Sequence, residues 1–321
     1  MRKKFAHLQA WLRERWLEVV MTAGLVGVVA WLGTIGYGFL PKPPPVPTPP
    51  PAGKFDGLTA YGHVLAQVEF GPRPTGSEAS QKTGDYILEK LKAAGWQTEE
   101  QPFIYQGVKG RNIIGRAGAG PVVIVGAHYD TRRRADNDPD TARRSEPVLG
   151  ANDGASGVAV LLELARALDK NRLKNEVWLT FFDAEDNGRL DGWEFIAGSR
   201  YMAQNLTAQP KAVIIVDMVG DADQQIFKER NSTPALQDKL WAIAANLGYE
   251  KFFIPEPKWA MTDDHTPFLQ RGIPAVDIID FDYAHWHTTQ DTTDKIAPIS
   301  LERVGRVVKT FLETQGVDLT R

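Results

Sequence analysis

The amino-acid sequence predicts an α/β fold, a mostly parallel mixed central sheet sandwiched between helices, preceded by one transmembrane helix. Two observations predict the sheet and its helices. Short, continuous apolar runs are typical of strands covered on both faces, and amphipathic helical patterns separate these runs. A third observation, an uncharged apolar segment near the N-terminus, predicts the membrane helix. We therefore divide the chain into residues 1–18, 19–40, 41–53 and 54–321.

Residues 1–18 form a basic segment, and residues 19–40 form the predicted transmembrane anchor. The anchor segment carries no charged residue, and roughly 20 apolar residues suffice to cross a bilayer. The basic residues before it are Arg2, Lys3, Lys4, Arg13 and Arg15. The positive-inside rule then places the N-terminus in the cytoplasm and the rest of the chain outside it. A cleaved signal peptide is the alternative, but its apolar core usually has only ~7–15 residues and ends at a small-residue cleavage site.

Residues 41–53 contain the run PKPPPVPTPPP and are predicted to form a stiff stalk. Proline at this density favours polyproline II, which rises about 3.1 Å per residue. Such a stalk would hold the following domain about 30 Å from the membrane. A ligand for a proline-recognition domain is a weaker alternative, because the segment adjoins the anchor on its outer side.

Residues 54–321 have the length of one α/β domain. The predicted buried strands are PVVIVGAHYD (121–130), EVWLTFFDAED (176–186), AVIIVDMVGD (212–221) and IPAVDIIDF (273–281). Two antiparallel edge strands are predicted at GWQTEEQPFIY and RNIIGRA. Helical spacing is found at residues 78–94, 157–170, 234–248 and 300–314. The sheet and helices together predict one folded domain.

The composition excludes several classes of site and partner. The chain has no cysteine, which excludes disulfides, thiolate metal sites and a cysteine nucleophile. Its formal net charge of -3 gives no reason to expect nucleic acid as a partner. Any metal site must therefore use histidine, aspartate and glutamate.

Acidic and histidine side chains gather where the predicted strands end. They are His128, Asp130, Asp153, Glu185, Asp186, Asp217 and His287. In open α/β sheets, ligands bind beyond the carboxyl ends of the strands. Imidazole and carboxylate groups are the ligands that Zn²⁺ takes when thiolates are absent. We therefore predict a catalytic zinc site with Asp153, Asp186 and His287 as ligands and Glu185 as a base that does not bind the metal. His128 and Asp217 would form a second site or support the first.

Each of these pieces also has an ordinary structural explanation when taken alone. The run DGASG is typical of a helix start with aspartate as the cap. The pair Glu185–Asp186 is typical of a solvated loop, and one histidine in a strand is as often a hydrogen-bonded core residue as a ligand. Their occurrence together, at one edge of one sheet, favours the metal site.

Six motifs occur in a fixed order along residues 54–314. They are GAHYDT, GANDGASGVAVLLELAR, FFDAED, VDMVGD, TDDHTPFLQRGIP and WHTTQDTTDKI. In this order they resemble the zinc aminopeptidase superfamily, and most closely its glutaminyl-peptide cyclotransferase branch. The resemblance implies a zinc-dependent catalytic domain that acts on the N-termini of peptides or proteins.

By position, the resemblance implies that Asp153, Asp186 and His287 bind zinc and that Glu185 is the general acid/base. Asp186 stands where animal cyclases have glutamate, and the aspartate form is similar to bacterial cyclases. The cysteine pair of the animal enzymes is absent here.

The resemblance also implies residues around the zinc ligands. Asp217 and Asp263 would form the acidic hydrogen-bond network that orients the general base. Trp286 would wall the substrate pocket, and Trp193 would be a second wall, although the spacing around it differs from that of animal cyclases.

Two activities occur in this superfamily, and the ligand residues do not separate them. A cyclase would use one zinc ion to convert N-terminal glutamine to pyroglutamate. An aminopeptidase would use two zinc ions bridged by Asp153, with His128 and Asp217 on the second. Asp263 in DDHTPFLQRG, the WH dipeptide and the AED form of the acid pair favour the cyclase. A third possibility, an inactive binding ectodomain, would be expected to lack ligands, and none is missing.

Two loops and two further histidines complete these expectations. The charge-rich loop at residues 131–147 is predicted to be a solvated insertion at the mouth of the site, and the loop FGPRPTGS (70–77) to line the same mouth. His285 is predicted to lie on the surface, and His265 to support the ligands from behind.

Overall fold

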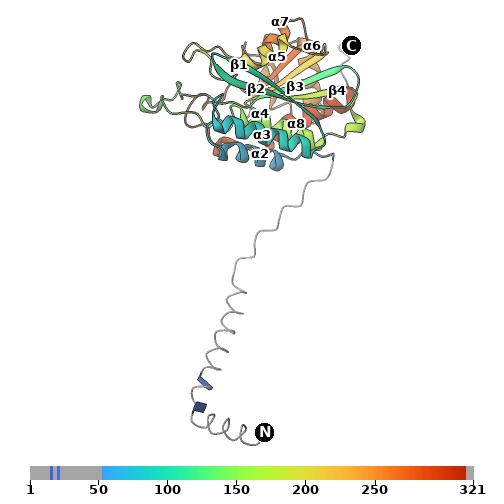
Figure 1. The fold of residues 1–321 in the computed structure, drawn as a ribbon. Coiled ribbons are helices and arrows are strands. Elements are labelled where there is room, and N and C mark those ends of the chain that lie inside the picture. Colours follow the sequence, from blue (N-terminus) through green and yellow to red (C-terminus); the bar gives the residue numbers. More distant parts are fainter. Residues whose placement is uncertain (1–14, 17–19, 22–52, 316–321) are drawn as a thin grey trace, which may run out of the picture. The chain divides into compact units, whose positions relative to one another are not determined.

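The structure, a computed structural model, describes residues 15–16, 20–21 and 53–315 of the chain (Figure 1). The chain divides into two units, Met1–Pro49 and Pro50–Arg321. The predicted anchor at residues 19–40 and the stalk at 41–53 lie outside the described residues, except for Val20, Met21 and Gly53. Within the described part, no helix combines the length and the apolar character needed to cross a bilayer.

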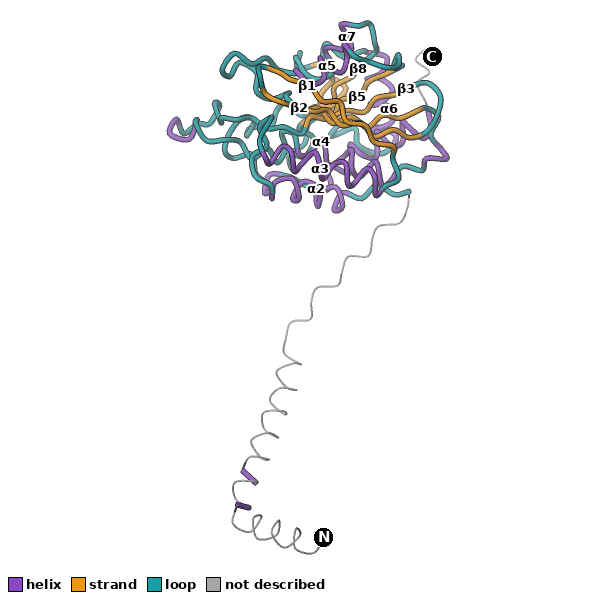
Figure 2. The backbone as a smooth tube through the Cα atoms, viewed as in Figure 1, coloured by secondary structure: helices purple, strands orange, loops and turns teal. Residues whose placement is uncertain are grey.

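A six-stranded mixed sheet lies at the centre of the second unit, with the strand order β1-β2-β4-β3-β5-β8 (Figure 2). Its strands are β1 (Gln97–Tyr105), β2 (Val108–Ala117), β3 (Val122–His128), β4 (Glu176–Phe182), β5 (Ala212–Asp217) and β8 (Ala275–Ile279). Strands β4, β3, β5 and β8 are parallel to one another, whereas β2 is antiparallel to both of its neighbours. The predicted mostly parallel mixed sheet is therefore confirmed, with the β1–β2 hairpin at one edge.

Helices cover both faces of this sheet (Figure 1). On one side of the sheet, a single apolar core is shared by the strands and the helices α2 (Gly57–Glu69), α3 (Glu78–Ala93), α4 (Ala155–Ala167), α6 (Pro234–Asn246) and α8 (Pro298–Thr310), with α2 packed on α4 and α8. The other side packs on α5 (Ala197–Gln204) and α7 (Thr266–Gln270). Because successive side chains of a strand point to opposite faces, Val123 and Val125 of β3 join the first core, while Val122 and Ile124 join the second. This explains why the parallel strands are continuous apolar runs.

The smaller elements include several that the sequence did not predict. These are α2, α5, α7 and a two-stranded parallel sheet of β6 (Ile226–Lys228) and β7 (Phe253–Pro257). The short helical turns are η1 (Thr141–Arg143), η2 (Lys170–Arg172), η3 (Thr293–Lys295) and η4 (Phe311–Gln315). Helices α5 and α7 have only 8 and 5 residues, too few to show an amphipathic period.

The helices begin where the sequence supplies a suitable first turn. The side chain of Ser77 accepts a hydrogen bond from the backbone N–H of Ser80 at the start of α3, and Asp56 does the same for Thr59 in α2. Proline stands in the first turn of α6, α7 and α8, where its missing N–H costs nothing. Helix α4 differs, because it starts after Gly154 at φ 95° without a side-chain cap. Its N-terminus belongs to the functional site.

Candidate metal centre and active site

The carboxyl ends of two neighbouring parallel strands bring together the first group of candidate ligands. His128 is the last residue of β3 and Asp217 the last of β5, and the two strands are paired. The Nε2 atom of His128 lies 3.1 Å from Asp217 Oδ1 and 3.1 Å from Asp153 Oδ1. All three side chains are buried, and their ligand atoms lie close enough together to hold one ion.

The predicted ligand set Asp153, Asp186 and His287 forms a second buried group beside the first. His287 Nε2 lies 2.8 Å from Asp186 Oδ1 and 3.7 Å from Asp153 Oδ2. Asp153 is therefore shared, with Oδ1 toward His128 and Oδ2 toward His287. The structure thus brings together three residues that are far apart in the sequence.

Two oxygens of this second group indicate that it is built for a cation. Asp153 Oδ2 and Asp186 Oδ2 are buried and have no hydrogen-bond partner among the described residues. Buried carboxylate oxygens without a partner are costly unless an ion satisfies them. One ligand atom from each of the three residues lies within 4.8 Å of the other two. One imidazole nitrogen and two carboxylate oxygens fit Zn²⁺ and leave a position for substrate.

The backbone around the candidate ligands is strained. The residues Ala184, Met218 and His287 have φ of 61°, 44° and 57°, a left-handed conformation that residues other than glycine rarely adopt. At Gly154 (φ 95°), a Cβ atom would lie 2.7 Å from the carbonyl oxygen of Asp130. Each left-handed residue costs on the order of 1–3 kcal/mol, and such strain is concentrated at functional sites.

Two buried carboxylates hold the ligand loops in place. Asp130 accepts hydrogen bonds from the backbone N–H groups of Glu185 and Asp186, at 2.9 and 3.2 Å. Asp291 accepts from the N–H groups of Asn152 and Asp153, at 2.8 and 3.1 Å. Burial and the nearby Asp153 raise the pKa of Asp291 to about 7. Asp291 is not the only acid in its motif, and nothing in the motif distinguishes it from Asp294, so sequence reasoning missed its role.

The loop at residues 131–147 is only partly the solvated insertion that the sequence predicts. Arg132 within it is buried and donates hydrogen bonds to the carbonyl oxygens of Asp186 (2.7 Å) and Gly188 (3.0 Å). The same guanidinium binds both oxygens of Asp136, and Asp136 Oδ1 lies 3.7 Å from His287 Nδ1. A carboxylate near the second nitrogen of a metal-binding histidine orients the ring. The loop therefore supports two of the three candidate ligands.

Glu185 lies beside these ligands in the environment of a general acid/base. Burial raises its pKa well above the usual range, and the charges of Asp186 and Asp263 add to this, while His128 opposes it. Burial likewise raises the pKa of Asp217 to about 8, against the opposing charge of His128. Buried acids with raised pKa values can hold a proton near neutral pH and transfer it.

A further acidic cluster lies next to Asp263. Asp263, His265 and Asp277 are buried and form a third group of possible ligands. His265 Nε2 lies 3.3 Å from Glu229 Oε2, and Nδ1 lies 3.9 Å from Asp277 Oδ2. Burial, followed by the charge of Asp263, raises the pKa of Asp264 and Asp277 well above the usual range. His265 is thus enclosed by acids, and its predicted role in support of the ligands stays a prediction.

The candidate ligands open into a cavity of about 350 Å³ with aromatic walls. Its aromatic lining residues are Phe195, Trp259, Phe281 and Trp286. The ring of Trp286 stacks on His287 with 3.8 Å between centroids, and Phe195 stacks on the same imidazole at 6.4 Å. Glu185 and Asp263 also line the cavity. Trp286 therefore lies in the wall of this cavity, and its contact with a substrate stays a prediction.

The structure places Trp193 elsewhere, which corrects the expectation of a second tryptophan wall. Trp193 is not among the residues that line the cavity. Its ring packs edge-on against Tyr105 at 5.1 Å and under the Arg133 guanidinium at 4.3 Å. The tight turn before it, in which the Trp193 N–H donates to Leu190 O, directs the chain so that Phe195 reaches the cavity instead.

The loop at residues 70–77 and His285 also have definite positions. Thr75 Oγ1 donates to Asp130 at 3.3 Å, so this loop supports the ligand loops, but none of its residues lines the cavity. Its Gly76 lines another cavity. His285 is half-buried and lies edge-on to Tyr283, so the prediction of a surface position is right only in part.

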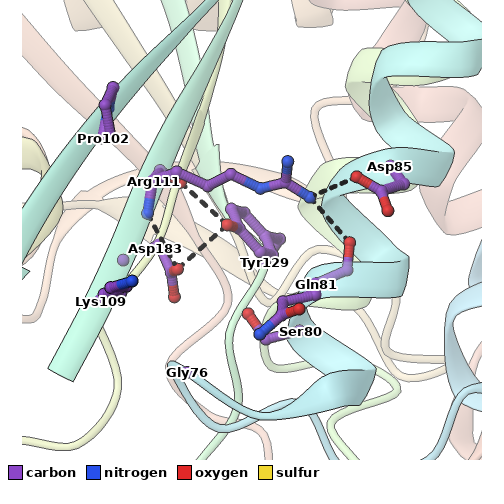
Figure 3. A pocket seen from close by; sticks show the side chains of 10 residues that line it. Gly76, Ser80, Gln81, Asp85, Pro102, Lys109, Arg111, Tyr129 and Asp183 are labelled. Atoms are coloured by element: carbon purple, nitrogen blue, oxygen red, sulfur yellow. Dashed lines mark hydrogen bonds and ion pairs between the residues drawn. The ribbon is translucent and has the colours of Figure 1, made fainter.

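That other cavity, of about 390 Å³, lies at Asp183 (Figure 3). Asp183 Oδ2 accepts a hydrogen bond from the backbone N–H of Arg111 at 3.2 Å and another from the Tyr129 hydroxyl at 3.0 Å. The Arg111 side chain extends away from Asp183 to Asp85 and to the carbonyl oxygen of Gln81. Burial and the charge of Asp130 raise the pKa of Asp183 to about 7. None of the candidate ligands lines this cavity, so we assign Asp183 to the support of the loop after β4.

Comparison with known proteins finds a matching family and several similar proteins. The family model of peptidase family M28 matches residues 112–312. A glutaminyl-peptide cyclotransferase-like protein of Mus musculus is 27% identical over 301 residues, 81% of this chain and 76% of its own length.

Two solved structures from Bacteroides thetaiotaomicron are similar over nearly their whole length. A glutaminyl cyclase bound to N-acetylhistamine is 34% identical with a TM-score of 0.77, covering 83% of this chain and 100% of its own. A leucine aminopeptidase precursor is 34% identical with a TM-score of 0.78, covering 82% and 98%. Because the family model spans more than half of the sequence and the site retains the motifs quoted above, this chain belongs to peptidase family M28 and is a homologue of the glutaminyl cyclases within it.

Proposed function

We propose that this chain is a zinc-dependent glutaminyl-peptide cyclotransferase, which converts the N-terminal glutamine of peptides and proteins to pyroglutamate with release of ammonia. The observation that carries the proposal is the pair of unpartnered buried oxygens, Asp153 Oδ2 and Asp186 Oδ2, beside Glu185 in an aromatic-walled cavity. They support a single zinc site, the form that a cyclase uses. Curated relatives and solved structures named as glutaminyl cyclases support the same activity.

When bound by Asp153, Asp186 and His287, Zn²⁺ would supply a Lewis acid that polarises the side-chain amide of the substrate glutamine. Glu185 takes a proton from the substrate's own α-amine as that nitrogen attacks the amide carbon. A new C–N bond closes the lactam ring, and the bond to the side-chain nitrogen breaks. Glu185 returns the proton to this nitrogen, which leaves as ammonia.

The cavity walls and the buried acids favour cyclisation over hydrolysis. Phe195, Trp259, Phe281 and Trp286 enclose the reacting groups with apolar surface, which limits the access of water. An enclosed pocket also holds the flexible glutamine chain in the folded form in which amine and amide meet. Asp217 and Asp263, which also line the cavity, would keep Glu185 oriented, and the charge of Asp263 adds to the burial that raises the pKa of Glu185.

A zinc aminopeptidase is the second candidate, because His128, Asp153 and Asp217 could hold a second ion. A solved neighbour named as a leucine aminopeptidase precursor also favours it. The hydrogen bonds of His128 weigh against it. Its Nδ1 lies 3.2 Å from the carbonyl oxygen of Asp130, and its Nε2 3.1 Å from Asp217 Oδ1. Both ring nitrogens of His128 are therefore paired. In the group at Asp186, by contrast, His287 Nε2 pairs with Asp186 Oδ1, but Asp153 Oδ2 and Asp186 Oδ2 have no hydrogen-bond partner among the described residues.

We also propose that residues 19–40 anchor the chain in a membrane, with the N-terminus in the cytoplasm and residues 54–321 outside. The uncharged apolar segment and the basic residues before it support this topology. Protease added to intact cells should remove the folded unit only if this topology holds. Recovery of the full-length chain in the soluble fraction would contradict it.

Product analysis by mass spectrometry tests the proposed activity. The full-length zinc-loaded chain is incubated with a peptide that begins with glutamine and with a matched peptide that begins with leucine. A cyclase shortens neither peptide and removes one ammonia from the first. Release of free leucine or free glutamine, without pyroglutamate, would instead establish the aminopeptidase.

A further inference from the structure

We propose that Arg189 forms a carboxylate-binding subsite at the mouth of the cavity. The subsite would favour substrates that carry a carboxylate next to the N-terminal glutamine. This inference rests on the proposed function, because it concerns the part of the peptide that follows the reacting residue. It adds a substrate preference that the zinc ligands and the general base do not determine.

The position of Arg189 is set by a strained backbone. Its φ is 64°, in the left-handed region that disfavours side chains. Its N–H donates to the carbonyl oxygen of Trp193 at 2.8 Å, which closes the turn that follows Asp186. Arg189 also lines the same cavity as Asp186 and Glu185. The loop that carries the general base and a zinc ligand thus also places a guanidinium at the cavity.

The charge of Arg189 has no carboxylate partner within 4.0 Å among the described residues. Neighbouring arginines differ in this respect. Arg132 binds Asp136, Arg134 binds Asp191 and Arg200 binds Glu194. The contact of Arg189 is instead aromatic, with its guanidinium carbon 6.0 Å from the centroid of the Phe195 ring. An exposed guanidinium without a counter-ion, held at a binding cavity, is available to a ligand.

The charges of the cavity define the direction in which a substrate would lie. The acidic residues that line the cavity are Asp153, Glu185, Asp186, Asp217 and Asp263. Glu185 is the proposed general base, and the other four belong to the groups of possible metal ligands. The N-terminal residue must enter this buried part to reach them. The rest of the peptide must leave through the exposed side, where Arg189 lies. Among the described lining residues, Arg189 is the one lysine or arginine.

A carboxylate is the group that this arrangement fits. The guanidinium is planar and offers parallel N–H donors that match the two oxygens of a carboxylate. Two parts of a substrate can supply that group. One is the side chain of a glutamate or aspartate that follows the N-terminal glutamine, and the other is the free C-terminus of a dipeptide.

The test compares matched peptides by their rate of ammonia release. The side-chain source is measured with Gln-Glu-Ala, Gln-Gln-Ala and Gln-Lys-Ala, each with an amidated C-terminus. The C-terminal source is measured with Gln-Ala against its amide. Because Arg189 is exposed, we expect the wild-type kcat/KM for the Glu peptide to exceed that for the Gln peptide by about 3–5-fold, mainly through KM. Added salt should reduce this ratio.

Two substitutions of Arg189 and one control complete the experiment. In R189A the Glu/Gln ratio should fall to about 1, and in R189E the Lys peptide should become the better substrate. The control is R200A, which removes the same charge from a half-buried arginine on α5 that does not line the cavity. It should keep the wild-type ratio. Zinc content, measured for every variant, shows whether the site remains intact.

The outcomes separate this inference from the proposed function. A wild-type enzyme that cyclises the neutral peptide without a preference for either carboxylate overturns the subsite alone. So does a preference that survives in R189A or is lost equally in R200A. If no peptide releases ammonia, the proposed function fails and the subsite fails with it. A preference for Gln-Ala over its amide, but not for the Glu peptide, assigns the subsite to the C-terminal carboxylate.

Discussion

Helix α4 connects two regions of the molecule that differ in how their polar groups are satisfied. Its body lies in an apolar core, where Leu161 and Leu164 are fully buried among the strands and helices α2 and α8. Its N-terminus follows Asp153, at an edge where buried acids lack partners and the backbone is left-handed at Gly154. The body of α4 therefore lies in a region that stabilises the fold, and its N-terminus lies in a region that destabilises the fold.

The difference implies that stability and function can be changed separately. Burial of apolar side chains contributes about 25 cal/mol per Å² and is the main favourable term of folding. Unpartnered buried oxygens and left-handed residues act against folding. A substitution at the edge should therefore remove function at little cost in stability, and one in the core should do the reverse.

The largest effect is expected for Asp186→Ala. Loss of one of three candidate ligands should abolish zinc binding and lower turnover by at least about 10⁴-fold. The unfolding free energy of the metal-free protein should change by no more than about 1 kcal/mol, because the lost bond to His287 is offset by removal of an unpartnered oxygen. Zinc content and chemical denaturation measure the two effects. Full zinc occupancy in this variant would exclude Asp186 as a ligand.

The next effect is expected for Glu185→Gln, which keeps the shape of the side chain but removes the titrating group. Turnover should fall on the order of 10²–10⁴-fold, the usual contribution of a general acid/base. Zinc content should stay at the wild-type level, because Glu185 is not one of the grouped ligands. Retained turnover with retained zinc would assign proton transfer to another group, such as Asp217.

How far the sequence predicts the fold depends on the length and burial of each element. Strands β3, β4, β5 and β8 were predictable because nearly every residue in them is buried, which gives an uninterrupted apolar run. Sequence reasoning missed helix α2 although it is 13 residues long. Gly57 and Gly62 lie in its first two turns, and glycine has a low helix propensity, which weakens the helical signal. Helices α5 and α7 were too short to show any pattern.

The candidate site was predictable for a different reason. Parallel strands end at the same edge of the sheet, so acids at or just after the ends of such strands, such as Asp217 and Asp186, come to line one cavity. Support from loops follows no such rule. Three consecutive arginines begin the loop at residues 132–134, and composition alone does not say that Arg132 is the buried one. The turn before Trp193 likewise decides which aromatic ring reaches the cavity.

The core side of the comparison is tested by Leu161→Ala. Truncation of a fully buried leucine should lower the unfolding free energy by about 2–5 kcal/mol, through lost burial and the cavity left behind. Zinc affinity below the unfolding transition should be unchanged. Leu65→Ala is the matched control, because Leu65 on α2 is 45% exposed and should cost well under 1 kcal/mol. Equal losses in both variants would contradict this account of the core.

The smallest effect concerns a titratable group on the core side, His63 of α2. Burial, with smaller contributions from the charges of Lys90 and Arg166, lowers its pKa from 6.5 to about 4. Its Nδ1 lies 2.6 Å from the hydroxyl of Tyr86. Burial raises the pKa values of Glu185 and Asp217 at the edge, whereas it lowers the pKa of this imidazole and so keeps the side chain neutral.

The sign of the pH dependence follows from this lowered pKa. Between pH 6.5 and about 4 the unfolded chain binds a proton at His63 that the folded chain does not, so stability falls as the pH falls through this window. Because the imidazole is half-buried, we expect the wild type to lose about 1–2 kcal/mol more than His63→Asn between pH 7 and pH 5. The acids with raised pKa values act in the opposite direction, but equally in both proteins, so they cancel in the difference. Denaturation curves at the two pH values measure it, and parallel losses in the two proteins would show that His63 does not titrate in this window.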